Sequence, residues 1–161
     1  MKRASTYFLQ TVIVLIGLLS LFILLRFPLY EGRNVDATLF EVYFQDPFLA
    51  YIYLAFVAVF VAYYQAFKLL AIIRSNAVFS VDGVRALRTI KYCAMTFIVF
   101  LLGAELWLFI FVRPLEEDIA GGVMMGLIMI FITTVVAVAA GLFERMLESA
   151  TDIKSENDLT V

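Results

Sequence analysis

The sequence contains no histidine and only one cysteine, and few of its residues are charged. Without histidine, one chain cannot build a His-ligated metal site, a Ser-His-Asp triad or a Cys-His dyad. The single cysteine, Cys93, excludes an intramolecular disulfide. These absences remove most of the usual catalytic and metal-binding arrangements. We expect a protein that is not an enzyme and that carries no cofactor or metal.

Most residues of the chain are apolar. Of the 161 residues, 64% are hydrophobic and 16% are charged, and the mean hydropathy is +0.99. A soluble domain is roughly half apolar and about a quarter charged. The charges here stand in short blocks between long apolar runs, so we expect lipid to surround those runs.

Four apolar runs are each long enough to cross the ~30 Å hydrocarbon core of a bilayer as a helix. They cover about residues 7–29, 47–73, 89–113 and 119–143. Asp46-Pro47 is typical of a helix start, an N-cap followed by proline in the first turn. Pro114 ends the third run after Arg113 and is expected to open the fourth helix, with the acids 116–118 in its first turn. We predict an all-α integral membrane four-helix bundle with up-down-up-down topology, formed by residues 1–161 as one domain.

The segments between and after these runs also carry patterns. Between the first two runs, apolar residues recur at helical spacing, which predicts either a short helix on the membrane surface or a loop that caps the bundle; they are Leu39, Phe40, Tyr43 and Phe44. In the connector 74–88, Ser80 is expected to cap a short helix with Asp82 in its first turn. The segment 144–161 is predicted to extend the fourth helix into water before a polar tail.

Small residues form a stripe on two of the predicted spans, where a neighbouring helix can approach closely. On the second span they are Ala55, Ala58, Ala62 and Ala66; on the fourth they are Gly122, Gly126, Thr133, Ala137 and Gly141.

The basic residues predict the orientation. Nine of the twelve Lys and Arg residues lie near the N-terminus, in or beside the central connector, or near the C-terminus. The other three, Arg26, Arg33 and Arg113, belong to the opposite side. Because positive residues favour the cytoplasmic side, we expect both termini in the cytoplasm.

Glu105 is an acidic residue inside a predicted span, and such residues often take part in proton or ion relays. A structural role is the alternative, in which Glu105 stays protonated or pairs with Arg26 from a comparable depth. Gln10 and Gln65 are further polar residues in or near the spans, and we expect them to form hydrogen bonds between helices.

The predicted cytoplasmic face carries a basic patch of Lys68, Arg74, Arg85, Arg88 and Lys91. These residues either bind anionic lipid head groups, at about 1 kcal/mol per charge, or only set the topology. The acidic residues of the tail, which include Glu144, Glu148, Asp152, Glu156 and Asp158, are an alternative partner for the patch. We expect no direct binding of nucleic acid.

Three segments together resemble one family. They are Tyr64-Gln65-Ala66-Phe67-Lys68-Leu69-Leu70, Phe79-Ser80 followed by Val84-Arg85-Ala86-Leu87-Arg88-Thr89-Ile90-Lys91-Tyr92-Cys93-Ala94, and the end of the chain from Asp152 to Val161. The chain is similar in these segments to the bacterial YoaS-like family, domain of unknown function 2975. The resemblance implies a multi-pass protein of the bacterial plasma membrane with a small helix-turn-helix regulator as a cytosolic partner. It implies no catalytic or ligand-binding residues, and Glu105 lies outside the matching segments.

Two hypotheses about function follow. The first is a non-enzymatic regulatory or interaction protein whose cytoplasmic connector and tail engage a partner, with Asp158, Leu159, Thr160 and Val161 as contact residues. The second is a small oligomeric transporter or channel that uses Glu105.

Overall fold

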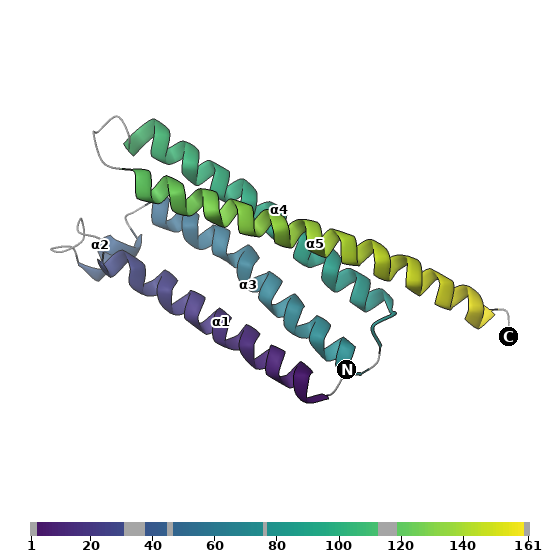
Figure 1. Cartoon of the computed structure of the whole chain (residues 1–161). Coiled ribbons are helices and arrows are strands. Elements are labelled where there is room, and N and C mark those ends of the chain that lie inside the picture. Colours follow the sequence, from purple (N-terminus) through teal and green to yellow (C-terminus); the bar gives the residue numbers. More distant parts are fainter. Residues whose placement is uncertain (1–2, 31–37, 45–46, 76, 113–118, 160–161) are drawn as a thin grey trace.

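The computed structural model describes residues 3–30, 38–44, 47–75, 77–112 and 119–159. The elements of these residues are all helical and follow the order α1 (Arg3–Tyr30), α2 (Leu39–Phe44), α3 (Pro47–Arg74), α4 (Val81–Trp107), the π-helical segment η2 (Leu108–Val112) and α5 (Ala120–Leu159) (Figure 1). Within this described part of the chain, four helices are long and apolar enough to cross a membrane. The prediction of an all-α fold with four spans is confirmed.

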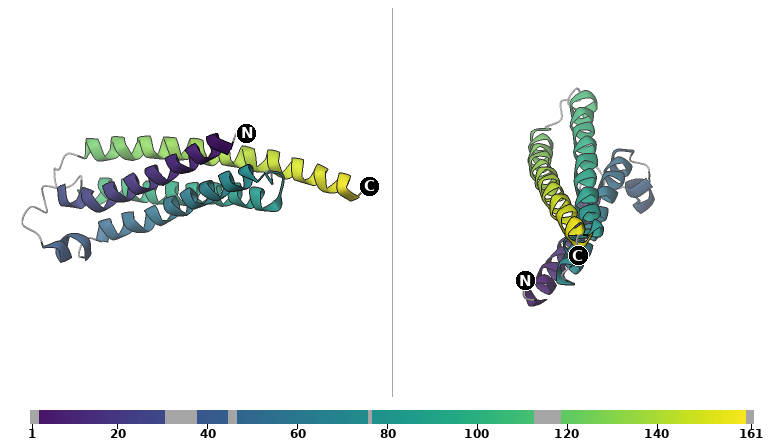
Figure 2. Two further views of the ribbon diagram at one scale, coloured as in Figure 1. Left: turned by 90° about the horizontal axis from the view of Figure 1, so that it is seen from below. Right: turned by 90° about the vertical axis from the view of Figure 1, so that its right-hand side faces the viewer.

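The four long helices follow chain order across the molecule. Close packing joins α1 to α3, α3 to α4, and α4 to α5 (Figure 2). Their directions alternate, so the start of α1 and the end of α5 lie at the same end of the molecule (Figure 1). We call this the termini end, and the opposite one the loop end. The connector between α3 and α4 also lies at the termini end.

Two helix boundaries differ from the sequence prediction. Ser80 caps α4 itself, because its backbone is extended and its hydroxyl accepts a hydrogen bond from the Gly83 N–H at 3.3 Å. The short helix predicted in the connector is therefore the first part of the third span. At the other end of the chain, α5 continues to Leu159 without a break. The predicted helix starts at Asp46 and Pro114, with the acids 116–118, lie outside the described residues.

The residues 39–44 form a helix, which decides between the two structures proposed for them. Thr38 and Glu41 form a reciprocal capping pair at its start: the Thr38 N–H and hydroxyl donate to Glu41 Oε2, both at 2.8 Å. The Glu41 N–H donates to Thr38 Oγ1 at 3.4 Å. Tyr43 Oη donates to the Leu25 carbonyl at 2.7 Å, so α2 rests on the last turns of α1.

Little of the apolar surface is buried inside the molecule. In the most apolar stretch of each long helix, at most 17% of the residues are buried. Two small buried clusters lie among α3, α4 and α5: Ala55, Phe97 and Leu101 between α3 and α4, and Val84, Leu87 and Leu147 between α4 and α5 at the termini end. Most apolar side chains thus face outward, as lipid-exposed residues do.

Glycines of α5 allow α4 to approach closely. A Cβ on Gly122 would lie 3.3 Å from the Leu108 side chain, and one on Gly141 would lie 3.3 Å from Cδ of Lys91. A Cβ on Gly126 would overlap the carboxyl group of Glu105. These glycines belong to the predicted small-residue stripe, which faces α4 as a close-packing surface should.

Candidate functional site

A cluster of charged side chains joins α4 to α5 near the termini end. Glu144 is only 4% exposed. Its Oε1 accepts from Arg88 Nε at 2.6 Å, and its Oε2 accepts from Lys91 Nζ at 2.6 Å. A second guanidinium nitrogen of Arg88 lies 3.0 Å from Glu148 Oε1. We call these four residues the charge cluster.

The spacing of these residues explains why they meet. Arg88 and Lys91 are three positions apart on α4, and Glu144 and Glu148 are four apart on α5, so each pair lies on one helix face. Gly141, one turn before the buried glutamate, leaves room for the stem of Lys91. The sequence suggested that the acidic tail meets the basic connector, and in the structure Glu144 and Glu148 do so.

A second polar contact joins α1 to α3 at the same end. Gln10, which is 6% exposed, donates from Nε2 to the Phe67 carbonyl at 3.3 Å. Its Oε1 accepts from Arg74 at 3.2 Å. The guanidinium carbon of Arg74 lies 4.6 Å from the ring centre of Tyr7. The hydrogen bond expected between helices is therefore formed by Gln10, whereas Gln65 is half-buried and has no hydrogen bond to a described residue.

The five residues of the predicted basic patch consequently divide into two groups. Arg88, Lys91 and Arg74 contact partners within the molecule. Lys68 is exposed and forms no ion pair with a described residue. The side chain of Arg85 is 73% exposed, and its only ion pair among the described residues is a 3.9 Å contact with the exposed Asp82.

Glu105 lies in the α4–α5 interface, where its carboxyl group fills the space left by Gly126. Its Oε2 is buried and has no hydrogen-bond partner among the described residues. The pairing with Arg26 considered from the sequence is not formed. Arg26 belongs to α1, which packs against α3, and its guanidinium carbon lies 5.7 Å from the ring centre of Phe22. The predicted pairing considered only the depths of Glu105 and Arg26 in the membrane. It did not take into account the order of the helices, in which α1 packs against α3 and Glu105 faces α5.

The predicted tail contacts lie at the far end of α5. Asp158 and Leu159 belong to its last turn. Thr160 and Val161 lie outside the described residues.

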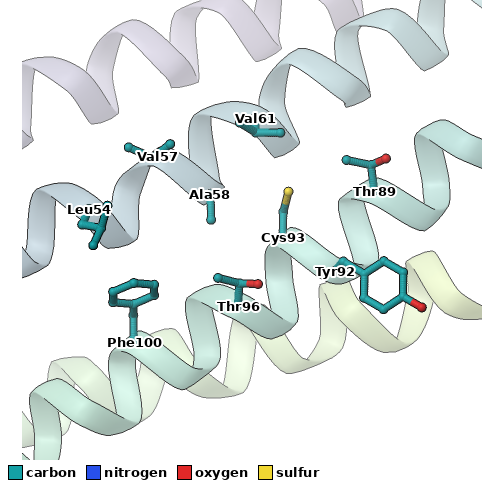
Figure 3. Close-up of a pocket in the computed structure, with 9 residues that line it drawn as sticks. All are labelled: Leu54, Val57, Ala58, Val61, Thr89, Tyr92, Cys93, Thr96 and Phe100. Atoms are coloured by element: carbon teal, nitrogen blue, oxygen red, sulfur yellow. The ribbon is translucent and has the colours of Figure 1, made fainter.

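A groove between α3 and α4 was not predicted from the sequence. Its volume is about 450 Å³, and Figure 3 shows Ala58 of α3 and Cys93, Thr96 and Phe100 of α4 facing the space between the two helices, whereas the ring of Tyr92 extends away from α3. The lining residues are Leu54, Val57, Ala58, Val61, Thr89, Tyr92, Cys93, Thr96 and Phe100. Spacings of three or four residues place Thr89, Cys93, Thr96 and Phe100 on one face of α4. That face forms a groove only because α3 packs beside it.

Comparisons with known proteins agree with a membrane protein of undefined activity. The profile of the family described as "Protein of unknown function (DUF2975)" matches residues 31–161. A Bacillus subtilis (strain 168) protein named "Uncharacterized membrane protein YoaS" is 42% identical over 163 residues, an alignment that covers 100% of both chains. No solved structure matches the chain. With a family match over most of its length and a relative aligned from end to end, the chain belongs to the DUF2975 family.

Proposed function

We propose that this multi-pass membrane protein is a non-enzymatic regulatory or interaction protein of the bacterial plasma membrane. Its termini end faces the cytoplasm and engages a partner such as a small helix-turn-helix regulator. The observation that carries the proposal is the last part of α5, which projects beyond the other helices as an arm whose residues 152–156 are exposed. We define the arm as residues 152–159.

The length of the arm follows from the packing at its base. Leu147 of α5 contacts Val84 and Leu87, close to the start of α4. Glu148 still contacts Arg88 of α4, and Figure 2 shows α5 continuing past the start of α4. Eight helical residues span about 12 Å, which is enough to hold a surface clear of the lipid head groups. The residues 152–156 are all exposed, including Ile153 at 61%.

The charge cluster gives the arm a rigid base. Glu144 and Glu148 hold α5 against α4 through Arg88 and Lys91, directly before the arm begins. A helix fixed at its base presents its side chains in a constant orientation, which lowers the entropy lost when a partner binds. Ile153 supplies an apolar contact among charged neighbours, as interaction surfaces commonly do.

The proposed orientation is supported by charge. Of the nine Lys and Arg residues that the structure describes, eight lie in the half of the molecule nearer the termini end, and Arg26 lies in the other half. An excess of Lys and Arg on one side of a membrane protein favours retention of that side in the cytoplasm.

Affinity capture from native membranes tests the proposal. The full chain is expected to capture a cytosolic partner, and a chain truncated after Lys154 is expected to lose it. Ile153→Ser should weaken capture in the same way. Val81→Ser is the matched control, because Val81 is 60% exposed at the same end but lies at the start of α4. Capture that is unchanged by truncation would reject the arm as the contact.

The alternative is a small oligomeric transporter or channel, and one observation favours it. Glu105 places a carboxyl group with an unpartnered oxygen between two membrane helices, where polar groups commonly serve transport. However, no group of three or more Cys, Asp or Glu residues suited to holding an ion is found in the described part of the chain. Ion flux into proteoliposomes that is lost in Glu105→Gln would support this alternative, whereas flux of equal size in both proteins would count against Glu105.

A further inference from the structure

We propose that the groove between α3 and α4 binds an anionic glycerophospholipid, with one acyl chain in the groove and the phosphate between Lys68 and Arg85. This site goes beyond the proposed partner contact and does not depend on it. Three features of the molecule support it: two cations without a strong ion pair among the described residues, the position of both cations at one end of the groove, and the length of the groove.

The first observation concerns charge. Of the cations around the α3–α4 connector, Arg74, Arg88 and Lys91 contact groups within the molecule. Lys68 is exposed and has no ion pair with a described residue, and Arg85 is 73% exposed with one long contact to Asp82. A long contact between two exposed groups contributes little, so both cations are available to an anion.

The second observation is the register of the two antiparallel helices. Phe48 lies beside Trp107, with ring centres 6.1 Å apart, and Tyr51 Oη donates to the Phe100 carbonyl at 2.8 Å. Leu69, much nearer the termini end, packs against the cluster that contains Val84. The same register places Lys68 at the level of Arg85.

Both cations also lie on the helix faces that line the groove. Lys68 is seven residues beyond Val61 on α3, and Arg85 is four residues before Thr89 on α4. Spacings of four and seven residues keep side chains on one helix face. Lys68 and Arg85 therefore stand on either side of the termini end of the groove, and the apolar lining continues from there into the membrane (Figure 3).

The third observation is length. From Thr89 to Phe100 the groove follows eleven residue steps of α4, or about 16 Å. Half of a ~30 Å hydrocarbon core is about 15 Å, so the groove has the depth of one leaflet. An apolar channel of one leaflet's depth, with two cations at the level of the head groups, matches a phospholipid with an anionic head.

The test uses the full chain in phosphatidylcholine nanodiscs that contain a minor fraction of brominated phosphatidylglycerol. A small fluorophore on Cys93, the only cysteine, reports bromine in the groove by quenching. We expect stronger quenching than with the same fraction of brominated phosphatidylcholine. Lys68→Gln and Arg85→Gln should each lower this preference about fivefold, and the double variant about thirtyfold.

Arg145→Gln with Lys154→Gln is the matched control, because both residues are exposed cations of α5, outside the groove. It should leave the preference unchanged, and Thr96→Trp should abolish the preference for phosphatidylglycerol by filling the groove. Native mass spectrometry of the unlabelled protein should show phosphatidylglycerol retained over phosphatidylcholine. Equal quenching by the two lipids, or equal losses in the control and the Lys68 variant, would overturn the proposal. Crosslinking of Cys93 to a second copy, with no quenching, would identify a dimer interface and also overturn it.

Discussion

Two glutamates of one helix interface have opposite surroundings. Glu144, near the termini end of the α4–α5 interface, accepts hydrogen bonds from two cations at 2.6 Å. Glu105, near the loop end, has a buried oxygen without a partner among the described residues. Both lie between α4 and α5. The charge of Glu144 is neutralised by Arg88 and Lys91, whereas Glu105 occupies the space beside Gly126.

The difference reflects position along the bilayer. Near the head groups, long Arg and Lys side chains can reach a carboxylate while parts of them stay exposed, as the 44% exposure of Arg88 shows. Deeper in the membrane, bringing a second charge is costly. There the two helices are joined through shape, with a glycine receiving the larger side chain. The interface is therefore electrostatic at one end and steric at the other.

The largest expected effect is at the electrostatic end. Glu144→Ala leaves Arg88 and Lys91 without their main partner and should lower the free energy of unfolding by about 2–3 kcal/mol. This loss of stability is smaller than that expected for breaking a fully buried ion pair, because Arg88 is 44% exposed. Unfolding in mixed micelles, followed by circular dichroism, provides the measurement. Glu148→Ala and Glu105→Gln should each cost less than about 1 kcal/mol, since the first is exposed and the second loses no partner. Equal losses in all three variants would contradict the comparison.

A smaller effect is expected at the steric end. In Gly126→Ala the new Cβ meets the carboxyl group of Glu105, whose Cδ would lie 2.8 Å away. The glutamate can partly move aside, so we expect a loss of about 1–2 kcal/mol in the same unfolding measurement. Gly121→Ala is the control because nothing lies within 4 Å of its added Cβ. Adding Glu105→Ala to Gly126→Ala should recover most of the loss, and strictly additive effects would argue against the contact.

The smallest effect concerns a third, fully exposed carboxylate, Glu41 of α2. The Thr38 backbone N–H, and then its hydroxyl, lower the pKa of Glu41 below its ordinary value. The charged form therefore stabilises the start of α2 above the ordinary pKa, and this contribution is lost as the pH falls through the lowered value. The amide resonances of Thr38 and Glu41 in micelles should titrate together in this acidic range. In Glu41→Gln they should not, and a titration that persists there would assign the effect to another group.

Much of the fold could be predicted because its signals are local. The apolar runs, the cap at Ser80 and the small residues of α5 each follow from neighbours along the chain. The limits of α4 and α5 were harder, since the connector and the tail are polar enough to suggest breaks. At the start of α4, the helix is supported because Val84 and Leu87 pack against Leu147 of α5. No local pattern contains that contact.

The candidate sites show the same division. Composition and periodicity are properties of the chain alone, so they were enough to predict which runs need lipid and on which side the basic residues gather. Which of the cations are neutralised depends on how the helices pack. Arg88 and Lys91 meet Glu144 because α5 lies beside α4, whereas no acid of another helix in the described part of the chain pairs with Lys68 or Arg85. Pairing across helices depends on their order and register, which an apolar pattern leaves open.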